Sequence, residues 1–109
     1  MSDTTTMPGT HYPAVAELAV FDSSGPRPQF LVDSEKLKVI VVGLESGQQI
    51  PAHPETLAVY QFLSGEGTMI VNGVDYAVSA GATIVAPPGA ARGMRASSRL
   101  IFLAVKSAS

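Results

Sequence analysis

The sequence predicts an all-β protein folded as a single sandwich or barrel. Short apolar runs rich in Val, Ile, Leu, Phe and Tyr alternate with turn signals from about residue 15 onward. No segment carries a convincing helical stripe, and many short strands at regular spacing are typical of sandwiches and barrels. We expect strands at 16–21, 29–32, 37–44, 57–63, 68–71, 74–78, 83–86, 92–95 and 100–105.

Two of these features need comment. The first segment is ambiguous, because 14–21 is also the best helix candidate in the chain. The pair Asn72-Gly73 between Val71 and Val74 is the strongest hairpin signal, since both central residues of a type I′ turn need positive φ.

The chain is expected to hold one domain at 14–109, preceded by a disordered tail at 1–13. Thr, Gly and Pro dominate the tail, and it lacks periodicity. A chain of 109 residues, 46% of them apolar, can bury one core and is too short for two ordinary domains.

Composition excludes several classes of function. Charged residues make up only 15% of the chain and the net charge is −2, so there is no electrostatic footprint for nucleic acid and no basic stripe for a membrane surface. The absence of cysteine excludes disulfides, thiolate metal sites and a cysteine nucleophile. Only His11 and His53 are histidines, so one chain cannot build a site from several of them.

The N-terminal sequence is polar and lacks a basic segment followed by an apolar run, unlike a secretory signal. No apolar stretch approaches membrane-spanning length. The sequence therefore predicts a cytoplasmic protein.

Two stretches, 47–67 and 81–96, carry a family resemblance. In the first, Gly47 is followed after five residues by His53, and the stretch closes with Phe-Leu-Ser-Gly-Glu-Gly. In the second, Gly81 is followed by a proline and a glycine at Pro87 and Gly89. In this order and separated by the Asn-Gly hairpin, they resemble the two conserved motifs of cupins. The resemblance covers roughly 28–105 and implies a cupin double-stranded β-helix, or jelly-roll barrel.

The resemblance also implies a metal site, which this chain has largely lost. Cupins typically hold a divalent metal with two histidines and a glutamate from the first motif and a histidine from the second. Here the glutamate position falls on Ala58 and the second-motif histidine on Arg92, which leaves His53, joined by Glu55 if His53 fills the first place. Alanine has no lone pair to donate, and arginine is a fixed cation without an acceptor. No tightly bound metal is therefore expected.

A divalent metal held by His53, Glu55 and Gln61 is the alternative, because some small cupins of this type carry a similar glutamine before the turn. Strand alternation places Tyr60 and Phe62 on one face and Gln61 on the other. If the first face points inward, Gln61 needs a bulge to reach the pocket.

The leading hypothesis is a metal-independent binding module for a small organic ligand, with His53, Tyr60, Gln61 and Arg92 around the pocket. Arg92 suggests an anionic ligand, because its guanidinium is a planar bidentate donor. The alternative is a metal-dependent dioxygenase or isomerase, and a metal-free enzyme with His53 as general base is a third class.

Each candidate residue also has an ordinary structural interpretation. Arg92 could equally be a surface arginine or a partner of Glu55, and Tyr60 a core residue. The strands 37–44 and 57–63 are apolar on both faces, more than a monomer of this size easily buries, which predicts a homodimer.

Overall fold

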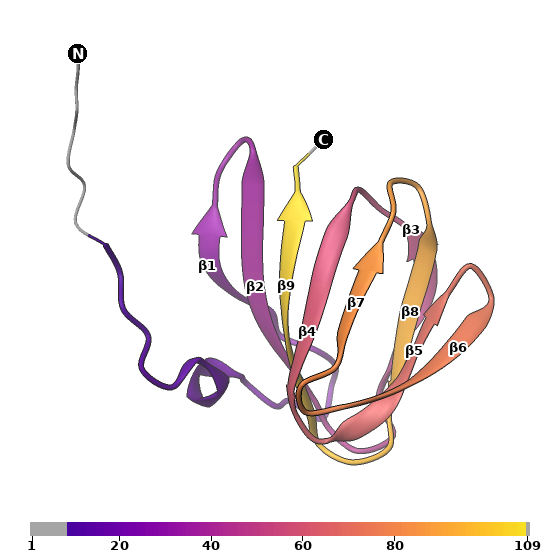
Figure 1. The fold of residues 1–109 in the computed structure, drawn as a ribbon. Helices are drawn as coiled ribbons and strands as arrows, with labels where there is room; N and C mark the ends of the chain where they lie inside the picture. The colour runs from indigo at the N-terminus through magenta and orange to yellow at the C-terminus, as the bar shows by residue number, and fades with distance from the viewer. Residues whose placement is uncertain (1–8, 109) are drawn as a thin grey trace.

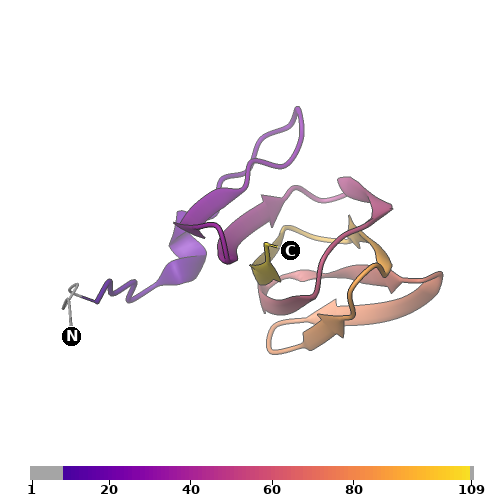
Figure 2. The same cartoon turned by 90° about the horizontal axis from the view of Figure 1, so that it is seen from above.

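The computed structural model describes residues 9–108 as two antiparallel β-sheets that share one core (Figure 1). One sheet has the strand order β1-β2-β9-β4-β7, and the other has the order β3-β8-β5-β6. Seen from above, the two sheets curve around this core (Figure 2). The strands are β1 (Gln29–Asp33), β2 (Leu37–Leu44), β3 (Gln49–Pro54), β4 (Ala58–Ser64), β5 (Glu66–Val71), β6 (Val74–Ser79), β7 (Thr83–Ala86), β8 (Ala91–Ala96) and β9 (Leu100–Ser107).

The core forms from the inward-facing residues of both sheets. In β4, Tyr60 and Phe62 are buried whereas Val59 and Gln61 are exposed, the alternation of a strand with one face in the core. The ring of Phe102 on β9 packs against both aromatic rings of β4, with centroid distances of 5.9 Å to Tyr60 and 5.8 Å to Phe62. Buried methionines of β5 and β8 complete the core from the other sheet.

The expected strands from residue 29 onward are confirmed, but the segment 16–21 is not a strand. It forms the 3-10 helix η1 (Val15–Leu18), followed by a single bridge between Val20 and Arg27. The segment covers β2 instead of extending a sheet: a Cβ added to Gly43 would lie 3.0 Å from a ring carbon of Phe21. A segment that packs across a sheet can have the same short run of apolar residues as a strand within the sheet, so the sequence pattern does not distinguish the two.

Strand β3 lies outside the strands that the sequence predicts. Pro51 and Pro54 lie within it, and prolines are tolerated in a strand only at an edge or a bulge. Both conditions hold here: β3 is an edge strand, and its pairing with β8 shifts register between Ile50 and His53. Gly93 of β8 permits this close approach, since a Cβ there would lie 2.6 Å from the main-chain oxygen of Ile50.

The Asn72-Gly73 hairpin is confirmed. Asn72 has φ of 49° and Gly73 has φ of 81°, and Val71 pairs directly with Val74 across the turn between β5 and β6. The two positive φ values are what a type I′ turn requires.

The expected N-terminal tail falls mostly outside the described residues, which begin at residue 9. From there to residue 13 the chain has neither helix nor strand. Within residues 9–108, no helix is long and apolar enough to cross a bilayer.

Candidate functional site

A cavity of about 250 Å³ lies between the two sheets. Its apolar wall includes Ile40, Val42, Ile50, Met94 and Phe102, which come from β2, β3, β8 and β9. Its polar lining is His53, Glu55, Tyr60, Arg92 and Lys106. An apolar chamber with a few convergent polar groups is the usual composition of a small-molecule site.

A second hollow of about 370 Å³ adjoins the first. The two share Pro28, Ile40, Glu55 and Lys106 in their linings. Glu55 and Lys106 therefore lie at the boundary between the apolar cavity and the outer groove.

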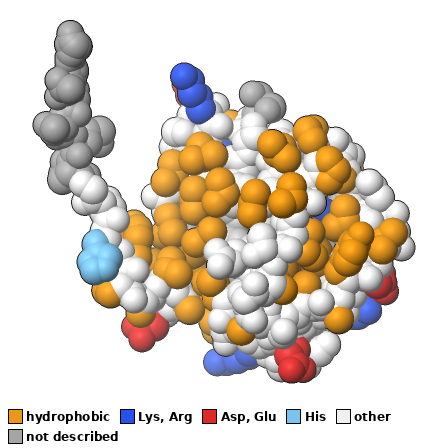
Figure 3. All heavy atoms as spheres, in the orientation of Figure 1, with side chains coloured by type: hydrophobic (Ala, Val, Ile, Leu, Met, Phe, Trp, Pro, Cys, Tyr) orange, Lys and Arg blue, Asp and Glu red, His pale blue; other side chains and the backbone are white. Residues whose placement is uncertain are grey.

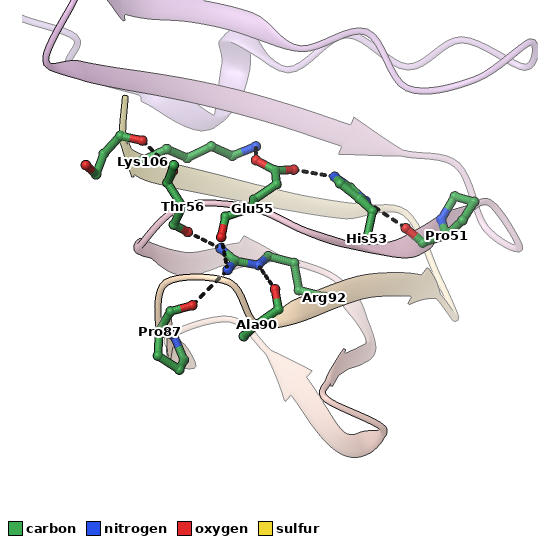
Figure 4. A network of polar contacts seen from close by, with 9 residues as sticks. Pro51, His53, Glu55, Thr56, Pro87, Ala90, Arg92 and Lys106 are labelled. Carbon is green, nitrogen blue, oxygen red and sulfur yellow. Dashed lines mark hydrogen bonds and ion pairs between the residues drawn. The ribbon is translucent and has the colours of Figure 1, made fainter. Parts of the chain in front are cut away.

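Glu55 links a histidine to a lysine at this boundary (Figure 4). Its Oε1 accepts a hydrogen bond from Nζ of Lys106 at 2.9 Å, and its Oε2 contacts Nε2 of His53. Nδ1 of His53 lies 2.9 Å from the main-chain oxygen of Pro51. The side chains of Lys106 and Glu55 are 21% and 25% exposed, and that of His53 is 49% exposed, so the chain of contacts runs outward towards solvent.

The environment of Glu55 favours its ionised form. Burial raises the pKa of this carboxyl group, but the hydrogen bonds from Lys106 and His53, together with their positive charges, outweigh burial and lower the pKa below its ordinary value of 4.5. Glu55 is therefore a carboxylate at neutral pH and accepts hydrogen bonds only.

The same contacts orient the ring of His53. The carbonyl oxygen of Pro51 and the carboxylate of Glu55 are both acceptors, and each faces a different ring nitrogen. Each of these contacts is a hydrogen bond when the ring nitrogen that makes it carries a proton. His53 therefore brings a basic side chain to the cavity rim, with an oxygen atom against each of its ring nitrogens.

Arg92 is buried, with only 2% of its surface exposed, and its guanidinium binds main-chain oxygens. It donates to Ala90 at 3.0 Å, Thr56 at 2.7 Å, Glu55 at 3.1 Å and Pro87 at 3.0 Å (Figure 4). These oxygens belong to the β3–β4 and β7–β8 connections. Arg92 therefore ties the two connections together, and four of its five N–H groups are already used.

The other predicted residues divide between the inside and the outside of the barrel. Tyr60 is 3% exposed and lines the cavity, and the centre of the Arg92 guanidinium lies 6.0 Å from its ring centroid. Gln61 points away from the core, is exposed and is not part of the cavity lining. Because β4 has no bulge at this position, the expectation that Gln61 reaches the pocket is corrected.

Lys106 is the site residue that sequence reasoning missed. The sequence predicts a last strand at 100–105, whereas β9 continues to Ser107 and includes the lysine. Alternation along β9 places Lys106 on the same face as Phe102 and Ala104, both buried. A lysine that continues the inward face of a strand was the available signal.

The comparisons with known proteins agree with this architecture. The family model described as "Cupin domain" matches residues 39–106, well over half of the chain. The chain belongs to the cupin domain family. Its two sheets are the jelly-roll barrel that the cupin motifs imply. No curated protein sequence matches this cupin.

Solved structures share the fold at low sequence identity. A conserved protein of unknown function from Streptococcus pyogenes, SPY1581, is 24% identical with a TM-score of 0.82, covering 100% of this chain and 96% of its own. An RmlC-like cupin from Desulfovibrio desulfuricans is 23% identical with a TM-score of 0.78, covering 94% and 98%. Salicylate 1,2-dioxygenase from Pseudoaminobacter salicylatoxidans is 18% identical with a TM-score of 0.72, covering 79% of this chain and 28% of its own.

The donor set of this cupin does not fit a tightly held divalent metal. Among residues 9–108, no three His, Cys, Asp or Glu side chains gather closely enough to hold an ion. The two candidate ligands, His53 and Glu55, contact each other, and Glu55 also binds Lys106. Gln61, the third ligand of the alternative set, lies on the outer face. Strong sites take three or four ligands, and a buried guanidinium nearby repels a dication.

Proposed function

We propose that this cupin is a binding module that takes a small organic ligand into its barrel without a tightly bound metal. One observation carries the proposal: an apolar cavity of about 250 Å³ whose polar rim holds a carboxylate between two basic side chains. Its volume lies just below the roughly 300–1,000 Å³ of pockets for drug-sized molecules, so the ligand is smaller. Three basic side chains against one carboxylate favour an anion.

A binding experiment on chelator-treated protein tests this proposal. Methyl NMR spectra are recorded while small carboxylates and their neutral analogues are added. Ligand entry predicts shifts at Ile40, Val42 and Met94, which line the cavity, and none at Val59 and Val85 on the outer face of the sheet. If no compound shifts the cavity methyls at millimolar concentration, the proposal fails.

The alternative is a metal-dependent enzyme, and the fold shared with a salicylate dioxygenase keeps it open. The donor set weighs against it, because His53 and Glu55 are the only two of the three candidate ligands that lie together. Elemental analysis of mildly purified protein tests it. A stoichiometric metal that is lost in His53→Ala would replace the binding-module proposal with this one.

We also propose that the protein forms a homodimer through the five-stranded sheet. A row of five paired valines crosses its outer face, one on each strand: Val32, Val39, Val105, Val59 and Val85. Figure 3 shows hydrophobic side chains gathered on this side of the molecule. An uncharged apolar row can pack against a second copy of itself, as a two-fold interface requires, and offers no charge to a different partner.

A further inference from the structure

The carboxylate of Glu55 occupies the most favourable position for an anionic ligand. It places one oxygen on Nζ of Lys106 and the other against Nε2 of His53, at the point where the apolar cavity meets the outer groove. Among the residues that line the cavity, it is the one carboxylate beside three basic side chains. Arg92 is engaged by main-chain oxygens, so His53 and Lys106 are the basic side chains that a ligand can reach.

Hydrogen bonds fix the backbone at Glu55, whereas its side chain is held by two contacts. The main-chain oxygen of Glu55 accepts hydrogen bonds from Gly89 N at 2.8 Å and from Arg92 at 3.1 Å. Only the side-chain contacts with Lys106 and His53 hold the carboxylate over the cavity, and the adjoining groove of about 370 Å³ gives it room to turn outward. Exchange of one carboxylate for another therefore needs a rotamer change and no loop movement.

We infer that Glu55 is a built-in competitor for the ligand, and that the ligand is a small monocarboxylate with an apolar body. The inference rests on the proposed binding function. The incoming carboxylate replaces Glu55 between Lys106 and His53, and its apolar part fills the wall formed by Ile40, Val42, Met94 and Phe102. A carboxylate has the two oxygens that two donors need, whereas the further oxygens of a phosphate would face apolar side chains without partners.

The experiment compares benzoate with its neutral analogue benzamide, by calorimetry and methyl NMR on chelator-treated protein. Glu55→Gln removes the competing charge and keeps the main-chain contacts. We expect Glu55→Gln to tighten benzoate binding about tenfold. This is the gain expected if the Glu55 carboxylate occupies the site about 90% of the time in the parent protein, since the apparent affinity is reduced by the fraction of sites that are open. Lys106→Met should weaken benzoate about tenfold or more because a charge-assisted hydrogen bond is lost. Benzamide should change less than about twofold in both variants.

Glu45→Gln is the matched control, because Glu45 also pairs with a basic residue, Arg99, but does not line the cavity. It should leave both affinities unchanged. Equal tightening of benzoate and benzamide by Glu55→Gln would overturn the inference, since it would mean that Glu55 only obstructs the entrance. So would unchanged benzoate binding in both site variants. In either case binding at the cavity methyls would still support the proposed function. No binding of benzoate to any variant would overturn the inference, and the function itself would fail only if none of the other small compounds shifted the cavity methyls either.

Discussion

Nη1 of Arg92 donates a hydrogen bond of 2.7 Å to the main-chain oxygen of Thr56, 36 residues earlier in the chain. This contact joins β8 to the connection between β3 and β4. Together with the bonds to Glu55, Pro87 and Ala90, it holds the cavity rim in place with a guanidinium. In this cupin the position that resembles a metal ligand has become a cross-link between two connections.

Replacing Arg92 with lysine should destabilise the protein by about 2–4 kcal/mol, because an ammonium group cannot reach four carbonyl oxygens at once and leaves buried acceptors unpaired. Urea unfolding measures the loss. Arg95→Lys is the matched control, since Arg95 lies exposed on the same strand and should change stability by less than about 0.5 kcal/mol. Equal midpoints for the two variants would refute the cross-link.

Gly93→Ala should cost about 2–4 kcal/mol, because the added Cβ would lie 2.6 Å from Ile50 O and 2.8 Å from Ala52 N. The edge strand that carries His53 would have to move away from β8. Thermal unfolding checks this against Gly9→Ala, where a Cβ meets nothing within 4 Å and stability should not change. A fully stable Gly93→Ala protein would show that β3 is not held as closely as described.

Stability should fall in acid as the paired carboxylates titrate. Hydrogen bonds from Ser24 and Arg27 lower the pKa of Asp22 from 3.8 to about 2, and the pKa values of Glu45 and Glu55 are also lowered from 4.5. A carboxyl group with a depressed folded-state pKa stabilises the fold above its ordinary pKa and loses that contribution as pH falls. The free energy of unfolding should therefore be level above about pH 5 and decline towards pH 2.

Asp22→Asn should make this acid decline less steep, whereas Asp75→Asn, at an exposed position on β6, should leave it unchanged. Unfolding measured at each pH unit between 2 and 7 compares the three proteins. An Asp22→Asn protein with the same acid slope as the parent would contradict the assigned role of Asp22.

Charge on the valine row should separate the proposed dimer. Val59→Glu combined with Val85→Glu places two carboxylates on the outer face of the five-stranded sheet, and like charges would meet across a two-fold interface. Light scattering at micromolar concentration should then report a monomer, while the parent is a dimer. Val74→Glu, exposed on the other sheet, is the control and should stay dimeric; a monomeric parent would contradict the proposal.

Most of the fold could be predicted from the sequence because alternation and turn residues are local signals. The valines, aromatics and the Asn-Gly pair identify strands from residue 29 onward. Two segments were predicted wrongly. The apolar run that ends at Phe21 packs across β2 and is not a strand. The segment with Pro51 and Pro54 forms an edge strand, although prolines are uncommon in strands. In both cases the position of the segment relative to the sheet decides the outcome, and position is not a local property.

The site could be predicted only in part. Motif spacing located His53 and Arg92 at the cavity, whereas the placement of Gln61 there was wrong, because alternation alone does not say which face of a strand points inward. The partners of Arg92 could not be predicted, because main-chain oxygens from distant connections carry no sequence signal. Lys106 meets Glu55 from 51 positions away, a pairing that only the strand order β9-β4 brings about.

The most direct test of the central claim is a benzoate titration of chelator-treated protein, repeated with a divalent metal added, while the methyl signals of Ile40, Val42 and Met94 are followed. We predict that these signals shift without metal and that the affinity is the same with it. Shifts that occur only when the metal is present would contradict a cavity that binds its ligand through its own side chains.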